Sequence, residues 1–522
     1  MDEQKGKILW VDDEIELLRP HIRLLTERGY DVSTATNGED ALTMVRQDGF
    51  DLVFLDEMMA GMGGLKTLAE IKDILPNLPV VMVTKNEEES LMEEAIGDKI
   101  SDYLTKPVNP SQVLMACKKF VEGKKITGAA VSKDYIKEFN EISVVLMGSP
   151  DHEQWVDIYA RLVGWGLELD GHPELGLKQT LLDQVRECNL TFGKYIERHY
   201  RDWMERTDDR PALSHEVVDR FVIPELQTEK SVLFFVIDCL RLDQWLIMEN
   251  LLHDYFTISK QFYFSILPTA TPYSRNAIFS GSYPSEVELR YPELWEKSED
   301  DESSRNRYER QFLDKLLERR KMVLKPEPKY VKILDAEFGR SIEHNINSYA
   351  QTKLTSIVVN FVDMLAHGRS DSTLLKEIAP DESAYRSLTR SWFLHSSLFA
   401  MLKTLSRNKN VTIILTTDHG SIRSLRGTKV LGDREASTNL RYKFGRNLKC
   451  EDKAAIYVKN PLEFKLPKRG VAVNYIIAKE DFYFVYPTDY HKYLNQYRDS
   501  FQHGGASMEE MILPVVKLEP KG

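Results

Sequence analysis

Aspartates and histidines in this sequence follow apolar runs at several separate places. Asp238 ends SVLFFVID, Asp363 ends TSIVVNFVD with His367 four residues on, and Asp418-His419 follows NVTIILTT. FQHGGASMEE adds His503 near the end of the chain. Oxygen and imidazole ligands without thiolates suit zinc or manganese in a catalytic site with open positions. The Asp-His pair alone could equally be the polar end of a buried strand, but the whole set predicts a metal site.

A nucleophile for such a site is available in PTATPYSRNAIFSG, residues 268 to 281. Thr271 stands in front of a helical pattern that begins near Pro272. A helix N-terminus presents free N–H groups and a partial positive charge, which suit both an alkoxide and a phosphate. Metal coordination would lower the pKa of the threonine hydroxyl, which is otherwise a poor nucleophile. The segment therefore predicts phosphoryl chemistry at Thr271, with Arg275 as a candidate substrate contact.

A second group of charged residues lies within the first 120 residues. Asp12 and Asp13 end one apolar run, and Asp56, Thr84 and Lys106 end or follow three others. Three clustered carboxylates repel one another, and a hydrated Mg²⁺ resolves this because it prefers oxygen ligands and leaves room for phosphate oxygens. Asp56 is then the expected phosphoryl acceptor, with Lys106 neutralising the new charge and the Thr84 hydroxyl turning to bond it.

The elements that must position these residues differ along the chain. Five short apolar runs alternate with helical patterns in the first 120 residues, which predicts a parallel sheet whose carboxyl edge collects the charged residues. Helical periodicity without strand runs follows, with Ser149 as an expected helix cap and Pro150 at the first helical position. Nearly continuous Val, Ile and Leu runs in the last 300 residues predict strands covered on both faces. We expect an α/β multidomain chain with a (βα)5 domain at 1–122, a helical bundle connector at 123–213 and an α/β/α domain at 214–522.

Composition restricts the class of protein. The 522 residues carry a net charge of -12, which argues against a protein that coats nucleic acid non-specifically. The four cysteines are isolated, so neither a disulfide framework nor a thiolate zinc site is indicated. No apolar run approaches the roughly 20 residues needed to span a bilayer. We expect a cytoplasmic protein without membrane insertion.

Two charged stretches each allow two interpretations. Residues 423–449 hold eight Lys or Arg against two acids and could grip a polyanion through Arg441 and Lys443. A solvated loop is an equally good interpretation. Residues 295–321 are rich in charge and end in an amphipathic helical pattern, which fits an insertion that is either a lid or solvated surface.

The first 122 residues resemble the CheY-like receiver domain of two-component response regulators. The resemblance rests on VDDE, FLDEMM, VT and TKP in the expected order. It implies a sensor histidine kinase as partner, Mg²⁺ bound by the three aspartates, and Tyr103 as the aromatic residue that changes position on phosphorylation.

Residues 225 to 520 resemble the PglZ branch of the alkaline phosphatase superfamily, through the Asp, His and Thr set described above. The resemblance implies a metal-dependent phosphodiesterase or phosphatase with Thr271 as nucleophile. It also implies two Zn²⁺, with Mn²⁺ as the alternative metal. One metal would be held by Asp238, Thr271, Asp418 and His419, and the other by Asp363, His367 and His503.

A receiver, a helical connector and a PglZ domain in this order resemble the PorX-type response regulators of type IX protein secretion. This resemblance implies homodimerisation on phosphorylation, hydrolysis of cyclic or linear oligonucleotides, and contacts with a sigma factor and a secretion-motor protein. A regulatory interaction module with a mainly structural metal site is the alternative. The enzyme is favoured because a structural site needs no nucleophile at Thr271.

Overall fold

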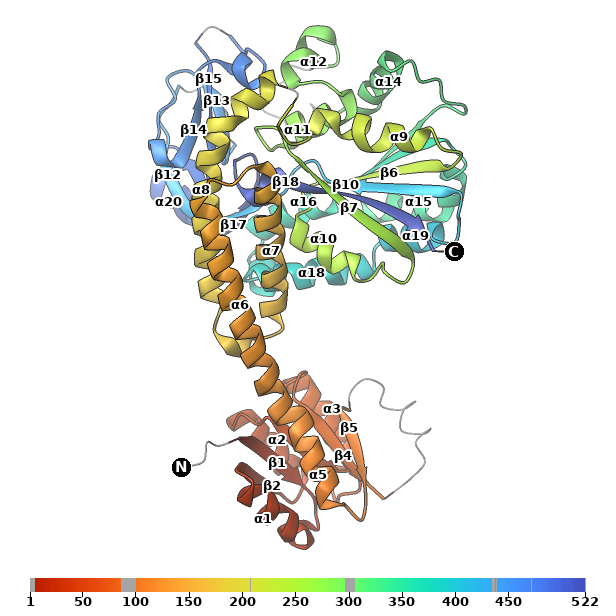
Figure 1. Ribbon diagram of the computed structural model, residues 1–522, viewed down its shortest axis with the longest axis vertical. Helices are drawn as coiled ribbons and strands as arrows, with labels where there is room; N and C mark the ends of the chain where they lie inside the picture. The colour runs from red at the N-terminus through yellow and green to blue at the C-terminus, as the bar shows by residue number, and fades with distance from the viewer. Residues whose placement is uncertain are drawn as a thin grey trace. The chain divides into compact units, whose positions relative to one another are not determined.

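The computed structural model describes residues 5–85, 100–206, 208–295, 306–433, 437, 439–470 and 472–521. The chain divides into two compact units, Met1–Glu138 and Phe139–Gly522 (Figure 1). The division does not test the expected domain boundaries after residues 122 and 213, which stay a prediction.

A parallel sheet with helices on both faces forms the first unit. In the described residues, its five strands have the order β2-β1-β3-β4-β5: β1 (Gly6–Val11), β2 (Tyr30–Ala35), β3 (Leu52–Asp56), β4 (Val80–Thr84) and β5 (Asp102–Thr105). Helices α2 (Gly38–Gln47) and α3 (Gly64–Ile74) pack on one face, and α1 (Arg19–Glu27) and α5 (Pro110–Cys117) on the other. The central strands β1, β3 and β4 are apolar on both faces because both faces are covered. The expected (βα)5 fold is confirmed.

Three long helices follow, namely α6 (Gly123–Met147), α7 (His152–Asp170) and α8 (Lys178–Glu205). The prediction of a helical connector is confirmed, but the predicted cap of its second helix is wrong. The Asp151 side chain, not that of Ser149, caps α7, because it accepts hydrogen bonds from the backbone N–H groups of Glu153 and Gln154. Gln154 accepts in return from the Asp151 N–H and completes a capping box.

A mixed sheet forms the centre of the second unit. Its described strands have the order β7-β18-β10-β6-β9-β8. Four of them run parallel: β6 (Ser231–Ile237), β8 (Lys329–Ile333), β9 (Leu354–Val359) and β10 (Val411–Thr416). The strand β18 (Ile512–Pro520) is antiparallel to both β10 and β7 (Phe256–Phe264). The carboxyl ends of the four parallel strands therefore meet at one edge of this sheet.

Helices cover both faces of this sheet. In Figure 1, α9 (Ile223–Leu226) and α11 (Thr271–Ser280) lie above it, and α10 (Leu242–Glu249) and α18 (Glu382–Leu394) lie below it. Val232, Phe234 and Val236 of β6 pack in the core under α11 and α14 (Glu309–Arg319). The sandwich confirms the expected α/β/α architecture.

The charged stretch 295–321 is described only in part. Its first part, residues 296–305, lies outside the described residues. Its second part forms α14, in which Phe312, Leu313, Leu316 and Leu317 are buried in the core. The expected amphipathic helix is confirmed, and the interpretation as solvated surface is wrong for its buried face, which belongs to one layer of the sandwich.

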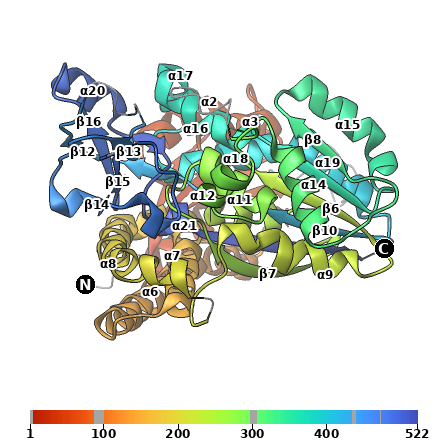
Figure 2. The ribbon, with the colours of Figure 1, turned by 90° about the horizontal axis from the view of Figure 1, so that it is seen from above.

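The basic stretch 423–449 contains β structure in its described part instead of a loop. It includes most of β11 (Ile422–Ser424) together with β12 (Arg426–Lys429) and β13 (Tyr442–Gly445). The β12 strand pairs with β16 (Phe482–Val485), and β13 pairs with β15 (Asn474–Ala478). Figure 2 shows these strands beside the main sandwich. The expectation of a loop is wrong because several of these residues are buried between the strands.

No helix in the described part of the chain is long and apolar enough to cross a membrane. All four cysteines are free thiols, in agreement with their isolated spacing. Cys117, Cys188 and Cys239 are buried, so they behave as small apolar core residues.

Candidate functional site

The carboxyl edge of the first sheet collects the expected acidic residues. Asp12 and Asp13 follow β1, and Asp56 is the last residue of β3. One carboxylate oxygen from each lies within 4.8 Å of the others. Lys106 follows β5, and its Nζ atom lies 3.0 Å from Asp12 Oδ2 and 2.9 Å from Asp56 Oδ1. Oxygen donors at this spacing fit a Mg²⁺ ion.

Burial and the neighbouring charges determine the pKa values of Asp56 and Lys106 at this edge. Burial, together with the neighbouring Asp12, raises the pKa of Asp56, while the hydrogen bond from Lys106 opposes that shift. Burial alone would lower the pKa of Lys106, but its hydrogen bonds to Asp56 and Asp12 raise it. The lysine is therefore charged and already faces the expected phosphoryl acceptor.

The two expected switch residues, Thr84 and Tyr103, differ in their burial. The Thr84 hydroxyl donates a 2.5 Å hydrogen bond to Glu57 Oε2, and the Thr84 side chain is buried. Tyr103 is 41% exposed. A Thr84 hydroxyl that bonds a phosphoryl group must first leave Glu57.

A buried group of three possible ligands lies at the edge of the second sheet. Asp238 directly follows β6, and Asp418 and His419 follow β10 by two and three residues. His419 Nε2 lies 3.6 Å from both Asp238 Oδ1 and Asp418 Oδ2. These two oxygens are buried and accept no hydrogen bond from the described residues. Buried carboxylate oxygens without a donor are costly, so the group fits a bound cation.

Thr271 lies against this group. It is the first residue of α11, so the helix begins one residue earlier than the sequence predicts, and the Thr271 Oγ1 lies 2.9 Å from His419 Nε2. His419 Nδ1 lies 3.0 Å from the Gly420 carbonyl oxygen, which can only accept, so the proton belongs on Nδ1. The lone pair of Nε2 therefore points towards the threonine hydroxyl and the two carboxylates.

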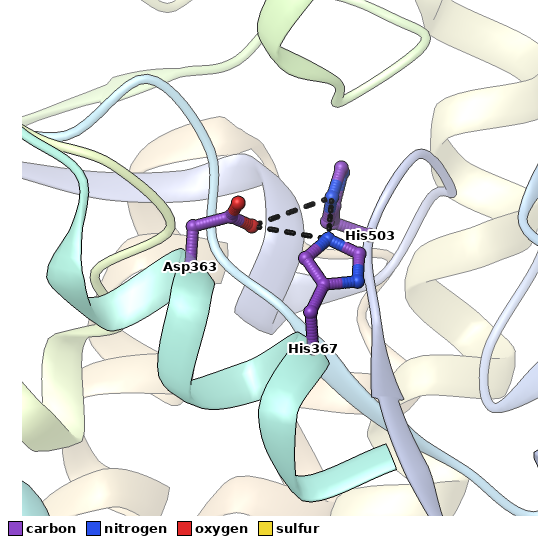
Figure 3. A group of neighbouring side chains, drawn as sticks. All are labelled: Asp363, His367 and His503. Atoms are coloured by element: carbon purple, nitrogen blue, oxygen red, sulfur yellow. Dashed lines mark hydrogen bonds and ion pairs between the residues drawn. The ribbon is translucent and has the colours of Figure 1, made fainter. Parts of the chain in front are cut away.

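A second group consists of Asp363, His367 and His503 (Figure 3). Asp363 lies on α16 (Phe361–Asp371), where the spacing of four residues puts His367 on the same face. The expectation that Asp363 ends a strand is wrong, because β9 stops at Val359. Asp363 Oδ1 lies 3.4 Å from His367 Nε2 and 3.6 Å from His503 Nε2, and the two nitrogens are 3.4 Å apart.

The two groups adjoin each other. The rings of His419 and His503 stack with centroids 4.2 Å apart and an interplanar angle of 19°. Burial and the neighbouring Asp418 raise the pKa of Asp238 to about 7, against the opposing charge of Arg275. Burial would also raise the pKa of Asp363, but His367 and His503 hold it well below its usual range. All seven predicted residues thus meet at one edge of the sheet.

Arg275 does not face outward as a substrate contact would. It is 1% exposed, and its Nη1 donates to Asp238 Oδ2 at 2.6 Å while its Nε donates to Glu309 Oε1 at 2.6 Å. The guanidinium is therefore the counter-charge of a ligand carboxylate. The sequence does not predict Glu309 as a site residue, because it comes from α14 and nothing in its local sequence indicates a contact with residue 275.

Arg441 and Lys443 do not form a surface grip. Arg441 is fully buried and pairs with Glu510, and Lys443 is 1% exposed and donates to the backbone oxygens of Ser437 and Asn439. The expected contact of these two side chains with a polyanion disagrees with their burial. Lys443 lies in β13, and Arg441 directly precedes that strand.

Several relatives match about a quarter of the chain. The alginate biosynthesis transcriptional regulatory protein AlgB of Pseudomonas syringae is 36% identical over 125 residues, or 24% of this chain and 28% of that protein. The transcriptional regulatory protein ZraR of Escherichia coli is 41% identical over 102 residues, or 20% of this chain and 23% of that protein. The chain thus spans about a quarter of the length of these relatives. The response regulator TrrA of Thermotoga maritima, solved with Mg²⁺ and BeF, is 30% identical and matches 22% of this chain and 98% of that one, with a TM-score of 0.21.

Family models cover most of the chain. The response regulator receiver domain matches residues 8–118, and the PorX response regulator linker domain matches residues 125–204. The BREX system PglZ alkaline phosphatase-like domain matches residues 217–518, which include both ligand groups and Thr271. The chain therefore belongs to the PglZ alkaline phosphatase-like family, as a response regulator of the PorX type with a receiver domain and a PorX linker.

Proposed function

We propose that this protein is a metal-dependent phosphodiesterase that a sensor histidine kinase controls through phosphorylation of Asp56. The observation that carries the proposal is the 2.9 Å distance from Thr271 Oγ1 to His419 Nε2, at the junction of two ligand groups. By resemblance to PorX-type regulators, the substrate is a cyclic or linear oligonucleotide and the pathway is type IX protein secretion. Contacts with a sigma factor and a secretion-motor protein belong to the same proposal.

The residues present fit two zinc ions, with manganese as the alternative metal. Thr271 would join the buried group of Asp238, Asp418 and His419 around one ion, and Asp363, His367 and His503 would hold the other. Bound zinc would lower the pKa of the threonine hydroxyl and offset the negative charge of the phosphate.

The chain itself supplies the nucleophile and its orientation. Thr271 Oγ1 gives up its proton and forms a bond to phosphorus, the P–O bond to the leaving alkoxide breaks, and the alkoxide takes up one proton in exchange. Water then attacks the phosphothreonine, which releases the phosphate ester and restores the hydroxyl. Thr271 is well placed for this reaction because the positive end of the ten-residue helix α11 lies at its backbone.

In the same proposal, the receiver domain is the part of the chain that the kinase phosphorylates. Asp12, Asp13 and Asp56 would hold Mg²⁺, and Lys106 already pairs with the acceptor at 2.9 Å. A phosphoryl group on Asp56 would attract the Thr84 hydroxyl away from Glu57, and Tyr103 would then change its exposure.

The Thr271→Val variant tests the nucleophile, because valine keeps the shape of threonine and lacks the hydroxyl. We expect the rate of hydrolysis of bis-p-nitrophenyl phosphate by zinc-loaded protein to fall by at least about 10³-fold. Ser274→Ala is the matched control, since it removes another buried hydroxyl from the same helix, where Ser274 Oγ donates to the Ala270 oxygen.

A Thr271→Val protein with full activity would show that another group is the nucleophile. If the zinc-loaded wild type hydrolyses neither this ester nor oligonucleotides, its output is binding to a partner protein instead.

A further inference from the structure

Helix α8 of the linker presents two buried polar side chains to the metal-binding part of the same unit. Asn189 is 3% exposed and Tyr200 is fully buried. They are 11 residues apart, which is close to three full helical turns, so both side chains leave the same face of α8. Each contacts a different backbone segment that holds the candidate site.

Asn189 holds α21 (Met508–Met511), the short helix that precedes β18. Its Oδ1 accepts a 2.9 Å hydrogen bond from the Met508 N–H. Its Nδ2 donates to both carboxylate oxygens of Glu509, at 3.1 and 3.0 Å. One amide side chain therefore fixes the first two residues of α21, and the burial of these groups makes the loss of any of these bonds costly.

The helix α21 in turn holds the residue next to a ligand. The Gly420 N–H donates to the Glu510 carbonyl oxygen at 3.2 Å. A Cβ atom at Gly420 would lie 1.9 Å from the Glu509 carbonyl oxygen, so the two backbones are in close contact. Because the Gly420 carbonyl also accepts from His419 Nδ1, a shift of α21 changes the orientation of the His419 ring.

Tyr200 holds the segment that leads to the nucleophile. Its hydroxyl accepts a 2.7 Å hydrogen bond from the Leu267 N–H, four residues before Thr271. Between them, Thr269 Oγ1 donates to the Gly505 oxygen at 2.7 Å and accepts from the Gly504 N–H at 3.1 Å. The segments that carry Thr271 and His503 are thus joined, and α8 supports one end of that connection.

We infer that α8 is a positioning element of the metal site, and that Asn189 and Tyr200 are positioning residues which set the metal affinity through α21 and the Leu267 segment. This inference rests on the proposed function, because that proposal assigns zinc to the site. It would give the linker a direct means of regulating the PglZ domain. A chain of hydrogen bonds connects the linker helix to a ligand residue, so a displacement of α8 alters the site without any new contact to substrate.

The test measures zinc affinity of the full-length chain by competition with a chromophoric chelator. We expect Asn189→Leu and Tyr200→Phe each to weaken zinc binding by about 10-fold, the lower end of the range for direct partners of metal ligands, because both side chains act through an intervening backbone segment. Gln184→Met is the matched control. Gln184 is 2% exposed on the same helix, but its Nε2 donates at 3.2 Å to the Phe139 oxygen of α6 and not to α21.

Thermal unfolding of all three variants separates positioning from general destabilisation. Similar melting temperatures for Asn189→Leu and Gln184→Met, with weaker zinc binding only in the former, support the inference. Equal zinc affinities in the wild type and both α8 test variants overturn it, as does an equal loss in Gln184→Met. Because zinc binding is measured without substrate, an inactive wild type counts against the proposed function only.

Discussion

The two oxygens of the Asp238 carboxylate have separate partners. Oδ2 accepts the 2.6 Å hydrogen bond from Arg275 Nη1, whereas Oδ1 faces His419 Nε2 and accepts no hydrogen bond from the described residues. Arg275 Nη1 also lies 3.8 Å from Asp418 Oδ2. The arginine therefore offsets part of the charge of the buried carboxylates and leaves Asp238 Oδ1 directed at the place where a cation fits.

Removal of the Arg275 guanidinium should destabilise the second unit. Arg275→Met leaves Asp238 and Glu309 buried without their main counter-charge, and breaking a buried ion pair from one side costs about 3–5 kcal/mol. Chemical denaturation of chelator-treated protein measures the effect without a contribution from bound metal.

Arg186→Met is the matched control for this substitution. Arg186 pairs with Asp183 at 3.2 Å, and both side chains are more than half exposed, so the loss should stay below about 1 kcal/mol. Equal free energies of unfolding for the Arg275 and Arg186 variants would contradict the counter-charge role.

Strand ends could be predicted from sequence, whereas contacts between distant elements could not. Asp56 and Asp238 stand at the ends of apolar runs, and β3 and β6 end at or just before them. The apolar run TSIVVNFVD contains a change from strand to helix after Val359, and its composition does not reveal that Asp363 belongs to the helix. The burial of Arg441 depends on its pairing with Glu510, a residue 69 positions away. No local sequence pattern indicates a contact between residues so far apart in the chain.

The contact between the turn after β10 and α21 should be intolerant of any side chain. In Gly420→Ala the added Cβ would meet the Glu509 carbonyl oxygen at 1.9 Å, so one backbone must move, and overpacking of this kind costs about 1–3 kcal/mol. We expect lower stability together with weaker zinc binding, because His419 moves with the turn.

Gly164→Ala provides the comparison for this change. Gly164 is exposed within α7, and a Cβ there would have no atom within 4 Å outside its own helix. Alanine should stabilise α7 by up to about 1 kcal/mol and leave zinc affinity unchanged. Weakened zinc binding in the Gly164 variant, or unchanged binding in the Gly420 variant, would count against this interpretation.

Communication between the two units requires an element that belongs to both. Helix α6 runs continuously from Gly123 to Met147, and the division between the units falls within it, after Glu138. In the second unit, Gln184 of α8 donates to the Phe139 oxygen of α6. Coupling of the receiver to α8 would require two distinct states of such an element.

Phosphorylation of Asp56 should join two chains. The phosphoryl group adds negative charge beside Lys106 and draws Thr84 from Glu57, which changes the receiver surface near Tyr103. Light scattering with Mg²⁺ and beryllofluoride, which mimics the phosphoryl group, should give twice the 60.4 kDa mass of one chain. When Mg²⁺ and beryllofluoride are added, the Asp56→Asn protein should keep the mass that is measured without beryllofluoride. Asp48→Asn, which alters a receiver aspartate at the surface, should respond as the wild type does, and an unchanged wild-type mass would reject dimerisation.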